Sequence, residues 1–384
     1  MSNETPLNGL LVLDLSRILA GPYCTMILGD LGADVIKIEH PDGDDTRRWG
    51  PPFVGGESAY FLAINRNKKS AAVDLKSSDG VELISRIAKQ ADVLVENFKP
   101  GTLERLGLSL AGLRAKNPRL ITLTVSGTGT TGPENALCGY DFVVQASGGL
   151  MSITGPAEGP PSKVGVPIVD LTTGMMAANA VLAALYARER TQLGQHIDIS
   201  LLETQVSWLA NVGSAYLITG QEPARMGHAH PSIAPYQLFN ACDGSFALAV
   251  GNDTQWQRLC AAIHRADLAA DARFHTNSAR VAHRIELETL LNLHFSKHTA
   301  DEWVDRIGRA GVPVGKVRGI SQVLNDPHVL AREMVVSVRH PTIGDLKLLG
   351  IPFKFSATPA SIRLAPPLLG QHTAEIRSCF PSAL

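Results

Sequence analysis

The chain has 384 residues, with 35 lysines and arginines against 36 aspartates and glutamates, which gives a formal net charge of -1 at pH 7. This balance excludes a strong positive electrostatic field that would attract nucleic acid or an anionic membrane. An anionic ligand must therefore be held by local residues. A chain of this length exceeds the usual size of one hydrophobic core, which predicts two domains.

The first elements are predicted to form a β-α-β unit, with strands at residues 10–16 and 33–40 around a helix at 21–32. The turn after the first strand contains Gly21 but no G-x-G-x-x-G sequence. Glu39, at the end of the second strand, therefore lacks the glycines that would make it a ribose-binding acid. The pattern argues against a nicotinamide dinucleotide site.

Strands and helices continue to alternate up to about Trp208. The further predicted elements are a polar loop at 41–57, strands at 71–75, 91–96, 120–125 and 195–200, and a helix at 81–90. This alternation is typical of an α/β fold with a mostly parallel sheet. We expect a Rossmann-like large domain over residues 1–220.

An apolar run over residues 165–169 ends in Asp170 and leads into a helix rich in Ala and Met that continues to about Arg190. We predict a strand-to-helix turn that places Asp170 at the carboxyl edge of the sheet, where open α/β folds bind ligands. From the spacing alone, the simplest interpretation is that Asp170 caps the helix by accepting amide hydrogen bonds. A chemical role requires support from other residues.

The pattern changes after Gly220. Two strand-like runs around Asp243-Gly244 predict a hairpin, and three amphipathic helices follow, near residues 256–265, 284–294 and 300–310. These elements predict a smaller α+β domain over residues 225–330.

Five cysteines without a C-x-x-C pair argue against a disulfide framework or a zinc site and favour a reducing, cytoplasmic location. They are Cys24, Cys138, Cys242, Cys260 and Cys379. The amino terminus lacks a signal core, and no stretch approaches the roughly 18 to 20 apolar residues of a membrane span. Metal-ligand, G-x-S-x-G and Walker motifs are absent from the sequence. We expect a metal-independent activity.

A series of small motifs resembles the class III coenzyme A transferases, the family that includes formyl-CoA and carnitine-CoA transferases and α-methylacyl-CoA racemases. The motifs are DLSRILAGPYC at 14–24, LGADVIKIEHP at 31–41, NRNKKSAAVDLK at 65–76, ENFKPGTLERLGL at 96–108, SGTGTTGP at 126–133, GYDFVVQASGGLMSITG at 139–155, the stretch around Asp170, and HPSIAPYQLF at 230–239. The resemblance extends over essentially the full chain. It implies an interlocked homodimer whose large domain is completed by residues 331–384, with acyl-CoA as a substrate and no permanently bound cofactor.

In that family the aspartate at the position of Asp170 is the nucleophile. The implied reaction passes through a mixed anhydride and an aspartyl-CoA thioester, and the helix that follows is expected to keep the carboxylate ionised. Backbone amides at Gly251 and Asn252 are the implied donors to the oxyanion. The alternative for this segment is a hairpin loop that ends in a helix cap at Asp253.

The resemblance also implies a set of CoA contacts. Lys76 and Arg105 suit the phosphates, while His40 and Phe98 suit the adenine or its ribose. A solvated surface charge is the alternative for each basic residue, and it is the expected state of Lys68, Lys69 and Lys99. The implied set is Arg17, Ile18, Ala20, His40, Leu75, Lys76, Asn97, Phe98 and Arg105.

Tyr140, Asp141 and Gln145 are predicted to line the acyl pocket, with Asp141 and Gln145 on one helical face. The racemases of the family read G-H-D where this chain has Tyr140 in the second place, and tyrosine, with an unperturbed pKa of about 10, is a poor replacement for a histidine acid/base. We therefore favour a transferase over an α-methylacyl-CoA racemase. A non-catalytic acyl-CoA-binding homologue is the further alternative.

The likeness is nearest to family members that use succinyl-CoA and dicarboxylic acids such as glutarate. Arg47, Arg48 and His228 are predicted to bind the distal carboxylate of such an acid. For the two arginines, the alternative is a charged mobile loop.

Overall fold

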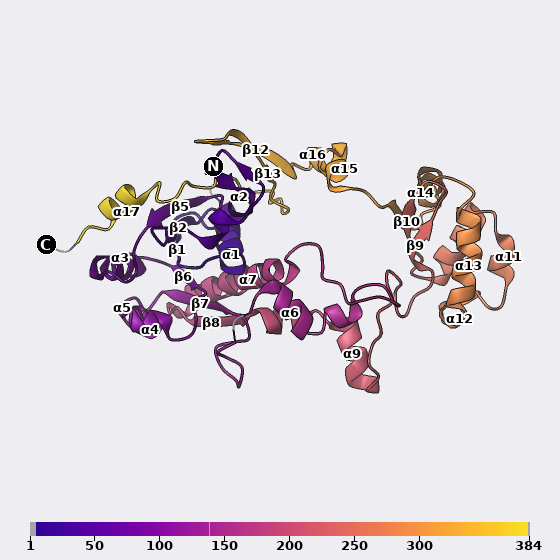
Figure 1. The fold of residues 1–384 in the computed structure, drawn as a ribbon, viewed down its shortest axis with the longest axis horizontal. Coiled ribbons are helices and arrows are strands. Elements are labelled where there is room, and N and C mark those ends of the chain that lie inside the picture. The colour runs from indigo at the N-terminus through magenta and orange to yellow at the C-terminus, as the bar shows by residue number, and fades with distance from the viewer. Residues whose placement is uncertain (1–4, 138, 383–384) are drawn as a thin grey trace. The chain divides into compact units, whose positions relative to one another are not determined.

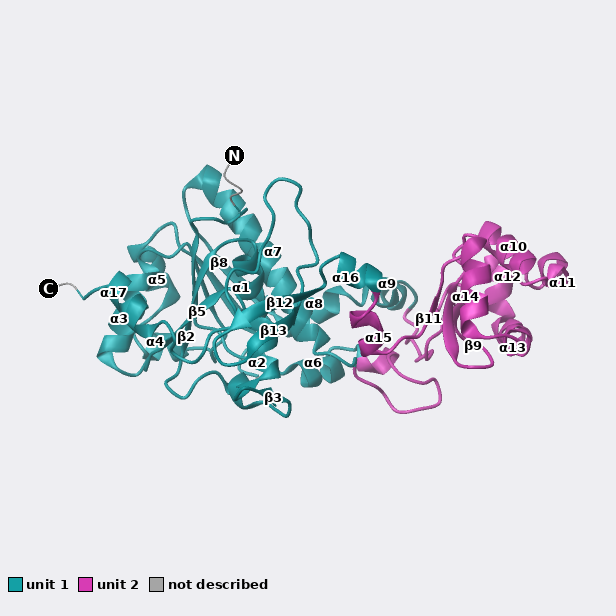
Figure 2. Ribbon diagram, turned by 90° about the horizontal axis from the view of Figure 1, so that it is seen from above, with its two compact units in different colours: residues 1–150, 164–219, 327–384 teal, residues 151–163, 220–326 magenta. Residues whose placement is uncertain are grey.

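A computed structural model describes residues 5–137 and 139–382, so Cys138 lies outside the described residues (Figure 1). The chain forms two compact units, of which unit 1 comprises residues 1–150, 164–219 and 327–384, and unit 2 comprises residues 151–163 and 220–326 (Figure 2). Residues 151–163, which the predicted boundaries include in the large domain, belong to unit 2.

Unit 1 contains a six-stranded sheet in which all neighbouring strands are parallel. Its strands are β1 (Leu11–Asp14), β2 (Asp34–Glu39), β5 (Lys68–Ala72), β6 (Val93–Glu96), β7 (Ile121–Ser126) and β8 (His196–Ser200). They lie in the order β5-β2-β1-β6-β7-β8, which is the order 3-2-1-4-5-6 of dinucleotide-binding folds when only these strands are numbered. The predicted α/β class with a parallel sheet is confirmed. The order reverses between β1 and β6, where such sheets bind ligands.

Helices cover both faces of this sheet. On one face, α1 (Ala20–Asp30) and α7 (Ile168–Thr191) form a core cluster that includes Val12. On the other face, α3 (Ser78–Ala88), α5 (Leu110–Lys116) and α17 (Thr373–Cys379) pack in a cluster that includes Leu13. Because successive strand residues point to opposite faces, β1 contributes to both clusters and reads as one apolar run.

Strand β5 begins at Lys68, three residues before the predicted strand at 71–75. The Lys68 side chain is fully buried, and its Nζ donates to Asp14 Oδ2 (3.1 Å), Pro22 O (2.8 Å) and Asn65 Oδ1 (3.0 Å). The expectation that Lys68 is a solvated charge is therefore wrong. Lys69 is partly exposed and pairs with Glu375 at 2.6 Å.

The described residues 139–167, directly before α7, contain no strand, so the predicted strand at 165–169 is wrong. Residues 165–166 form a bend, and Pro167, with φ −72°, lies at the helix boundary, where its missing N–H costs nothing. Asp170 consequently lies in the first turn of α7 rather than at the end of a strand.

Helix α7 is also apolar enough, by length and composition alone, to span a membrane, since it contains an 18-residue window of mean hydropathy 1.6. The expectation that no stretch is long and apolar enough for a membrane span is wrong by this criterion. The helix packs along α1 and places Val169, Ala177 and Val181 in the core of unit 1, which accounts for its composition.

Unit 2 contains the predicted hairpin, formed by β9 (Tyr236–Asn240) and β10 (Ser245–Ala249), with β11 (Val314–Lys316) added antiparallel to β10. The three predicted helices are present as α10 (Asp253–Ala262), α13 (Arg284–Phe295) and α14 (Ala300–Arg309). Their core surrounds Trp256, Phe295 and Trp303.

The remaining elements are mostly short, and several were not predicted. They are η1 (Asp45–Arg48), β3 (Phe53–Val54), β4 (Glu57–Ser58), α2 (Ala59–Ile64), α4 (Thr102–Arg105), α6 (Asp141–Ser147), η2 (Met151–Ile153), α8 (Leu201–Ser207), α9 (Ala210–Thr219), α11 (Ala266–Ala270), α12 (Asn277–Ala282), α15 (Ile320–Leu324), α16 (Pro327–Ala331), β12 (Val335–His340) and β13 (Gly344–Leu349). Within unit 1, the carboxyl-terminal segment contacts Asn67, whose Oδ1 accepts from the amides of Arg363 (2.6 Å) and Leu364 (2.9 Å).

Candidate active site

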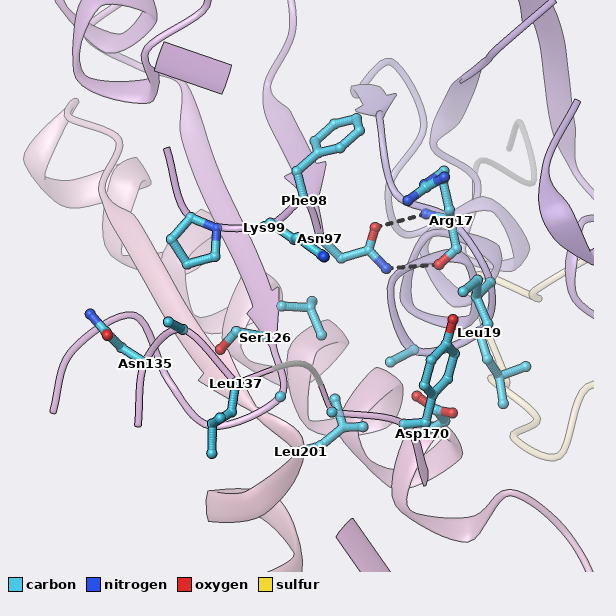
Figure 3. Close-up of a pocket in the computed structure, with 18 residues that line it drawn as sticks. Arg17, Leu19, Asn97, Phe98, Lys99, Ser126, Asn135, Leu137, Asp170 and Leu201 are labelled. Atoms are coloured by element: carbon cyan, nitrogen blue, oxygen red, sulfur yellow. Dashed lines mark hydrogen bonds between the residues drawn. The ribbon is translucent and has the colours of Figure 1, made fainter. Parts of the chain in front are cut away.

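A cavity of about 310 Å³ lies at the carboxyl ends of β1, β6 and β7, at the point where the strand order reverses (Figure 3). Asp170, from the first turn of α7, forms part of its wall. The complete lining is Arg17, Ile18, Leu19, Ala20, Asn97, Phe98, Lys99, Pro100, Val125, Ser126, Gly127, Asn135, Ala136, Leu137, Gly139, Tyr140, Asp170 and Leu201. This is the position at which an open α/β sheet binds its ligand.

The turns that follow β1 and β6 are joined directly. Arg17 N donates to Asn97 Oδ1 (2.9 Å) and Asn97 Nδ2 donates to Arg17 O (2.8 Å), as the dashed lines in Figure 3 show. The Arg17 guanidinium also lies 5.9 Å from the centre of the Phe98 ring. The two turns therefore form one wall of the cavity.

The amino terminus of α7 is capped by Asp141. Asp141 Oδ2 accepts from the amides of Val169 (2.7 Å) and Asp170 (3.3 Å), which have no partner within the helix. The interpretation of Asp170 as the cap is wrong, because Pro167 occupies the cap position and a side chain from α6 accepts the bonds. The capping residue Asp141 thus lies 28 and 29 positions before the amides that it caps.

Asp141 is held in turn by Gln145. Gln145 Nε2 donates to Asp141 Oδ1 (2.6 Å), and Gln145 Oε1 accepts from Val164 N (2.9 Å). Both side chains are buried. The predicted placement of Asp141 and Gln145 on one helical face is confirmed, but neither residue lines this cavity, and their contacts fix the start of α7.

Burial raises the pKa of Asp170 to about 7, and the negative charge of Asp141 contributes to the increase. The helix start was expected to help keep Asp170 ionised, but burial and the neighbouring like charge move its ionisation towards neutral pH. Near neutral pH, both protonation states of Asp170 are populated.

Tyr60, on α2, was not identified from the sequence. Burial raises its pKa to about 12, with further contributions from the charges of Asp170, Asp141 and Asp44. Its hydroxyl is therefore protonated throughout the neutral range and lies within electrostatic reach of Asp170. Nothing in the local sequence of α2 signals this proximity.

Five of the predicted CoA contacts line the cavity together with Asp170, namely Arg17, Ile18, Ala20, Asn97 and Phe98. Tyr140 also lines it and is 55% exposed. Lys99, which was expected to be only a solvent charge, lies in the wall as well. Leu19 and Leu201 are further lining residues that the sequence did not reveal.

Four predicted CoA contacts lie outside this cavity. His40 is exposed and its Nδ1 accepts from Asp42 N (3.2 Å), and Arg105 Nη2 donates to Thr102 Oγ1 (2.9 Å). Leu75 packs against the core, whereas Lys76 is exposed. Their contact with CoA stays a prediction.

Arg47 is already paired within the protein. Its guanidinium donates to both carboxylate oxygens of Glu39 (2.7 and 2.8 Å) and to Glu57 (3.0 Å), and it lies over the Phe61 ring. This arrangement favours a structural role over the predicted binding of a substrate carboxylate. Arg48 is exposed and donates to Asp42 O (2.8 Å).

The predicted residues Gly251, Asn252 and His228 belong to unit 2. Asn252 caps α10, because its side chain accepts from Gln255 N (2.9 Å), whereas the alternative interpretation of this segment placed the cap at Asp253. Gly251 N donates to Gln255 Oε1 (2.7 Å), and His228 Nδ1 accepts from Leu238 N (3.2 Å). Their roles in catalysis and substrate binding stay predictions.

Among residues 5–137 and 139–382, no group of three or more His, Cys, Asp or Glu side chains is arranged to hold a metal ion. The chemical groups that line the cavity are the carboxylate of Asp170, the hydroxyl of Tyr140 and the basic side chains of Arg17 and Lys99.

Comparison with known proteins agrees with this arrangement. The family model described as CoA-transferase family III matches residues 7–373. The chain is 43% identical to a human protein named succinyl-CoA:glutarate CoA-transferase, over 98% of this chain and 86% of the relative. It is 41% identical to the succinate–glutarate CoA-transferase of Agrobacterium fabrum, over 98% and 96%. A crystal structure of a CAIB/BAIF family protein from Brucella suis superposes with a TM-score of 0.88 at 43% identity, over 98% of this chain and all of that one.

Proposed function

The chain belongs to CoA-transferase family III, and from this premise we propose that it moves CoA from succinyl-CoA, or another short acyl-CoA, to a dicarboxylic acid, with Asp170 as the covalent nucleophile. The observation that carries the proposal is the position of the Asp170 carboxylate in the wall of the cavity at the switch point of the sheet.

The proposed reaction proceeds by successive exchanges at acyl carbons. An oxygen of Asp170 attacks the donor thioester carbon, and the CoA thiolate leaves to give a mixed anhydride. The thiolate then attacks the aspartyl carbon of the anhydride, which forms an aspartyl-CoA thioester and releases the donor acid. The acceptor carboxylate repeats these steps in reverse, so that the acceptor leaves as its CoA thioester and Asp170 is restored.

The environment of Asp170 supports this role. A fully hydrated carboxylate is a weak nucleophile, and partial desolvation raises its reactivity when the substrate holds it near the reacting carbon. The pKa of about 7 leaves Asp170 ionised above neutral pH while marking the loss of solvent around it. Neither attack requires a proton to be removed from the nucleophile, so the mechanism needs no histidine base.

We expect transfer to be fastest with four-carbon and five-carbon dicarboxylates, because the names of the relatives specify succinate and glutarate. The measurement is formation of new CoA thioesters from succinyl-CoA with a panel of acceptors, including glutarate, oxalate and a monocarboxylate of equal length. Equal rates with the monocarboxylate would contradict a site that recognises the second carboxylate.

The same preparation separates the alternatives. A racemase exchanges the α-hydrogen of a 2-methylacyl-CoA for deuterium without an acceptor acid, whereas the transferase does not. A non-catalytic homologue binds CoA tightly but transfers it to no member of the panel. Either result would overturn the proposed function.

We also propose that the chain functions in the cytoplasm as an interlocked homodimer. Apolar side chains are unusually exposed on α7 and α9, with Tyr186 at 68% and Leu217 and Ile218 at 83% each. Apolar surface of this kind marks an interface with another chain. We expect sedimentation equilibrium at micromolar concentration to give twice the mass of 41.0 kDa, and a monomeric mass would exclude the dimer.

A further inference from the structure

The turn that forms the wall beside β1 has a strained backbone. Ile18 has φ 71°, in the left-handed region that β-branched residues rarely adopt. Strain of this kind persists only where surrounding contacts over-determine the conformation, and it concentrates at functional sites. Ile18 and its neighbours Arg17 and Leu19 all line the cavity.

The contacts that hold this turn come from a buried ion pair. Lys37 Nζ donates to Ser16 O (2.9 Å), on one side of the turn. On the other side, the amide of Ile18 is shared between the two carboxylate oxygens of Asp44, at 3.4 and 3.3 Å. Lys37 and Asp44 are themselves joined at 2.9 Å, with side-chain exposures of 0% and 1%.

Asp44 is fixed in place by its own partners. Its Oδ1 accepts from both the amide (3.0 Å) and the hydroxyl (2.8 Å) of Thr46, and its amide donates to Glu39 Oε2 (3.0 Å). Although burial opposes ionisation, the Lys37 ammonium lowers the pKa of Asp44 to about 2. Asp14 and Glu39 also contribute negative charge around Lys37.

A fully buried ion pair is weak evidence for a role in stability, because apolar residues of similar volume commonly serve as well. The Lys37–Asp44 pair differs from a simple pair in that both of its members bind the backbone of one cavity-lining turn. That arrangement gives the pair a second effect, on the shape of the cavity.

We propose that Asp44 is a positioning residue for acyl-CoA, which together with Lys37 holds residues 16–18 in the conformation that receives the ligand. The proposal rests on the proposed function, because it takes a CoA thioester as the ligand of this cavity. Asp44 itself does not line the cavity.

The test is Asp44→Asn, which keeps the shape of the side chain but removes its charge and presents an amide group to the Lys37 ammonium. We expect the KM for acyl-CoA and the Kd for free CoA each to rise about tenfold, while kcat and the KM for the acceptor acid change by less than about twofold. Calorimetric titration with CoA measures binding without turnover.

Asp30→Asn is the matched control. Asp30 is also buried and pairs with Arg66 at 2.6 Å, but it lies at the far end of α1 and does not line the cavity. We expect both variants to lower Tm and only Asp44→Asn to weaken CoA binding. Unchanged CoA binding in Asp44→Asn, or an equal loss in both variants, would overturn the proposal.

Thr46→Val provides a milder variant that decides the question if Asp44→Asn does not fold. It removes one hydrogen bond to Asp44 and leaves the ion pair, so we expect a twofold to threefold rise in the Kd for CoA, on the order expected for one lost positioning contact. An unchanged Kd would contradict the proposal. If the wild-type protein itself fails to bind CoA, the proposed function is at fault rather than the role of Asp44.

Discussion

Asp170→Asn is expected to abolish CoA transfer while leaving CoA binding intact. Asparagine preserves the size of the side chain and the cavity, but its amide oxygen cannot form the anhydride. We expect kcat to fall by at least about 10³-fold, as for loss of other covalent nucleophiles. The measurement is thioester exchange between succinyl-CoA and glutarate, together with calorimetric titration of CoA.

Chemical trapping adds a readout that does not depend on rate. Hydroxylamine added during turnover should convert the carboxylate of Asp170 in the wild-type protein to a hydroxamate, detected by mass spectrometry of the peptide. Asp345→Asn is the control, since that side chain is 80% exposed, on β13. Retained transfer in Asp170→Asn, with no modified peptide in the wild type, would exclude the covalent mechanism.

The same substitution should stabilise the protein at alkaline pH. Because the folded-state pKa of Asp170 is raised from 3.8 to about 7, the folded state binds a proton more tightly than the unfolded state does. The contribution of Asp170 to the free energy of unfolding is therefore fully present below pH 4. It is lost as pH rises towards 7, by at most on the order of 1.4 kcal/mol per pKa unit. Asp170→Asn removes this dependence, so its free energy of unfolding should exceed that of wild type at pH 8 but not at pH 4. Parallel stability curves would contradict the raised pKa.

The local sequence pattern was sufficient to predict most strands of the parallel sheet. Strands β1, β2, β6, β7 and β8 are each short segments that contain apolar β-branched or leucine residues, and all were predicted within two residues of their observed bounds. The predicted bounds of β5 began three residues too late, because a lysine such as Lys68 is usually a surface charge. Only the fold brings Asp14 to its Nζ, at a separation of 54 residues.

Part of the candidate site was also predictable, because several of its residues lie in short local motifs. Resemblance identified Asp170 and the turns at Arg17 and Asn97, which the structure brings into one cavity. The electrostatic state of Asp170 could not be read from sequence, because the cap of α7 comes from α6 and the nearby Tyr60 comes from α2. Long-range polar contacts of this kind leave no periodic signal.

Replacement of Asp141 is the second substitution with a large expected effect, because this residue caps the helix start that carries Asp170 and its charge contributes to the raised pKa of Asp170. In Asp141→Asn, the oxygen can still accept from Val169 N, but the new amide group then faces Gln145 Nε2. Gln145 cannot reverse its own amide without giving up the bond to Val164. Two opposed donors cost about 1–3 kcal/mol and loosen the first turn of α7.

We therefore expect two separable changes in the pH profile of kcat/KM, which reports groups of the free enzyme. For wild type we expect activity to rise with pH through about 7, as Asp170 ionises. Loss of the neighbouring negative charge lowers the pKa of Asp170, so the rise moves to lower pH in Asp141→Asn. The plateau falls about tenfold to a hundredfold, because the nucleophile is less well positioned. Tyr60 stays protonated across this range and does not confuse the result.

Two control variants separate charge from geometry. Asp141→Glu keeps the negative charge but misplaces the cap, so the plateau should fall while the midpoint stays near that of wild type. Ser147→Ala, on the exposed side of the same helix, should change neither quantity. If Asp141→Asn keeps the wild-type midpoint, the charge of Asp141 does not act on Asp170. If it keeps the wild-type plateau, the cap does not position the nucleophile.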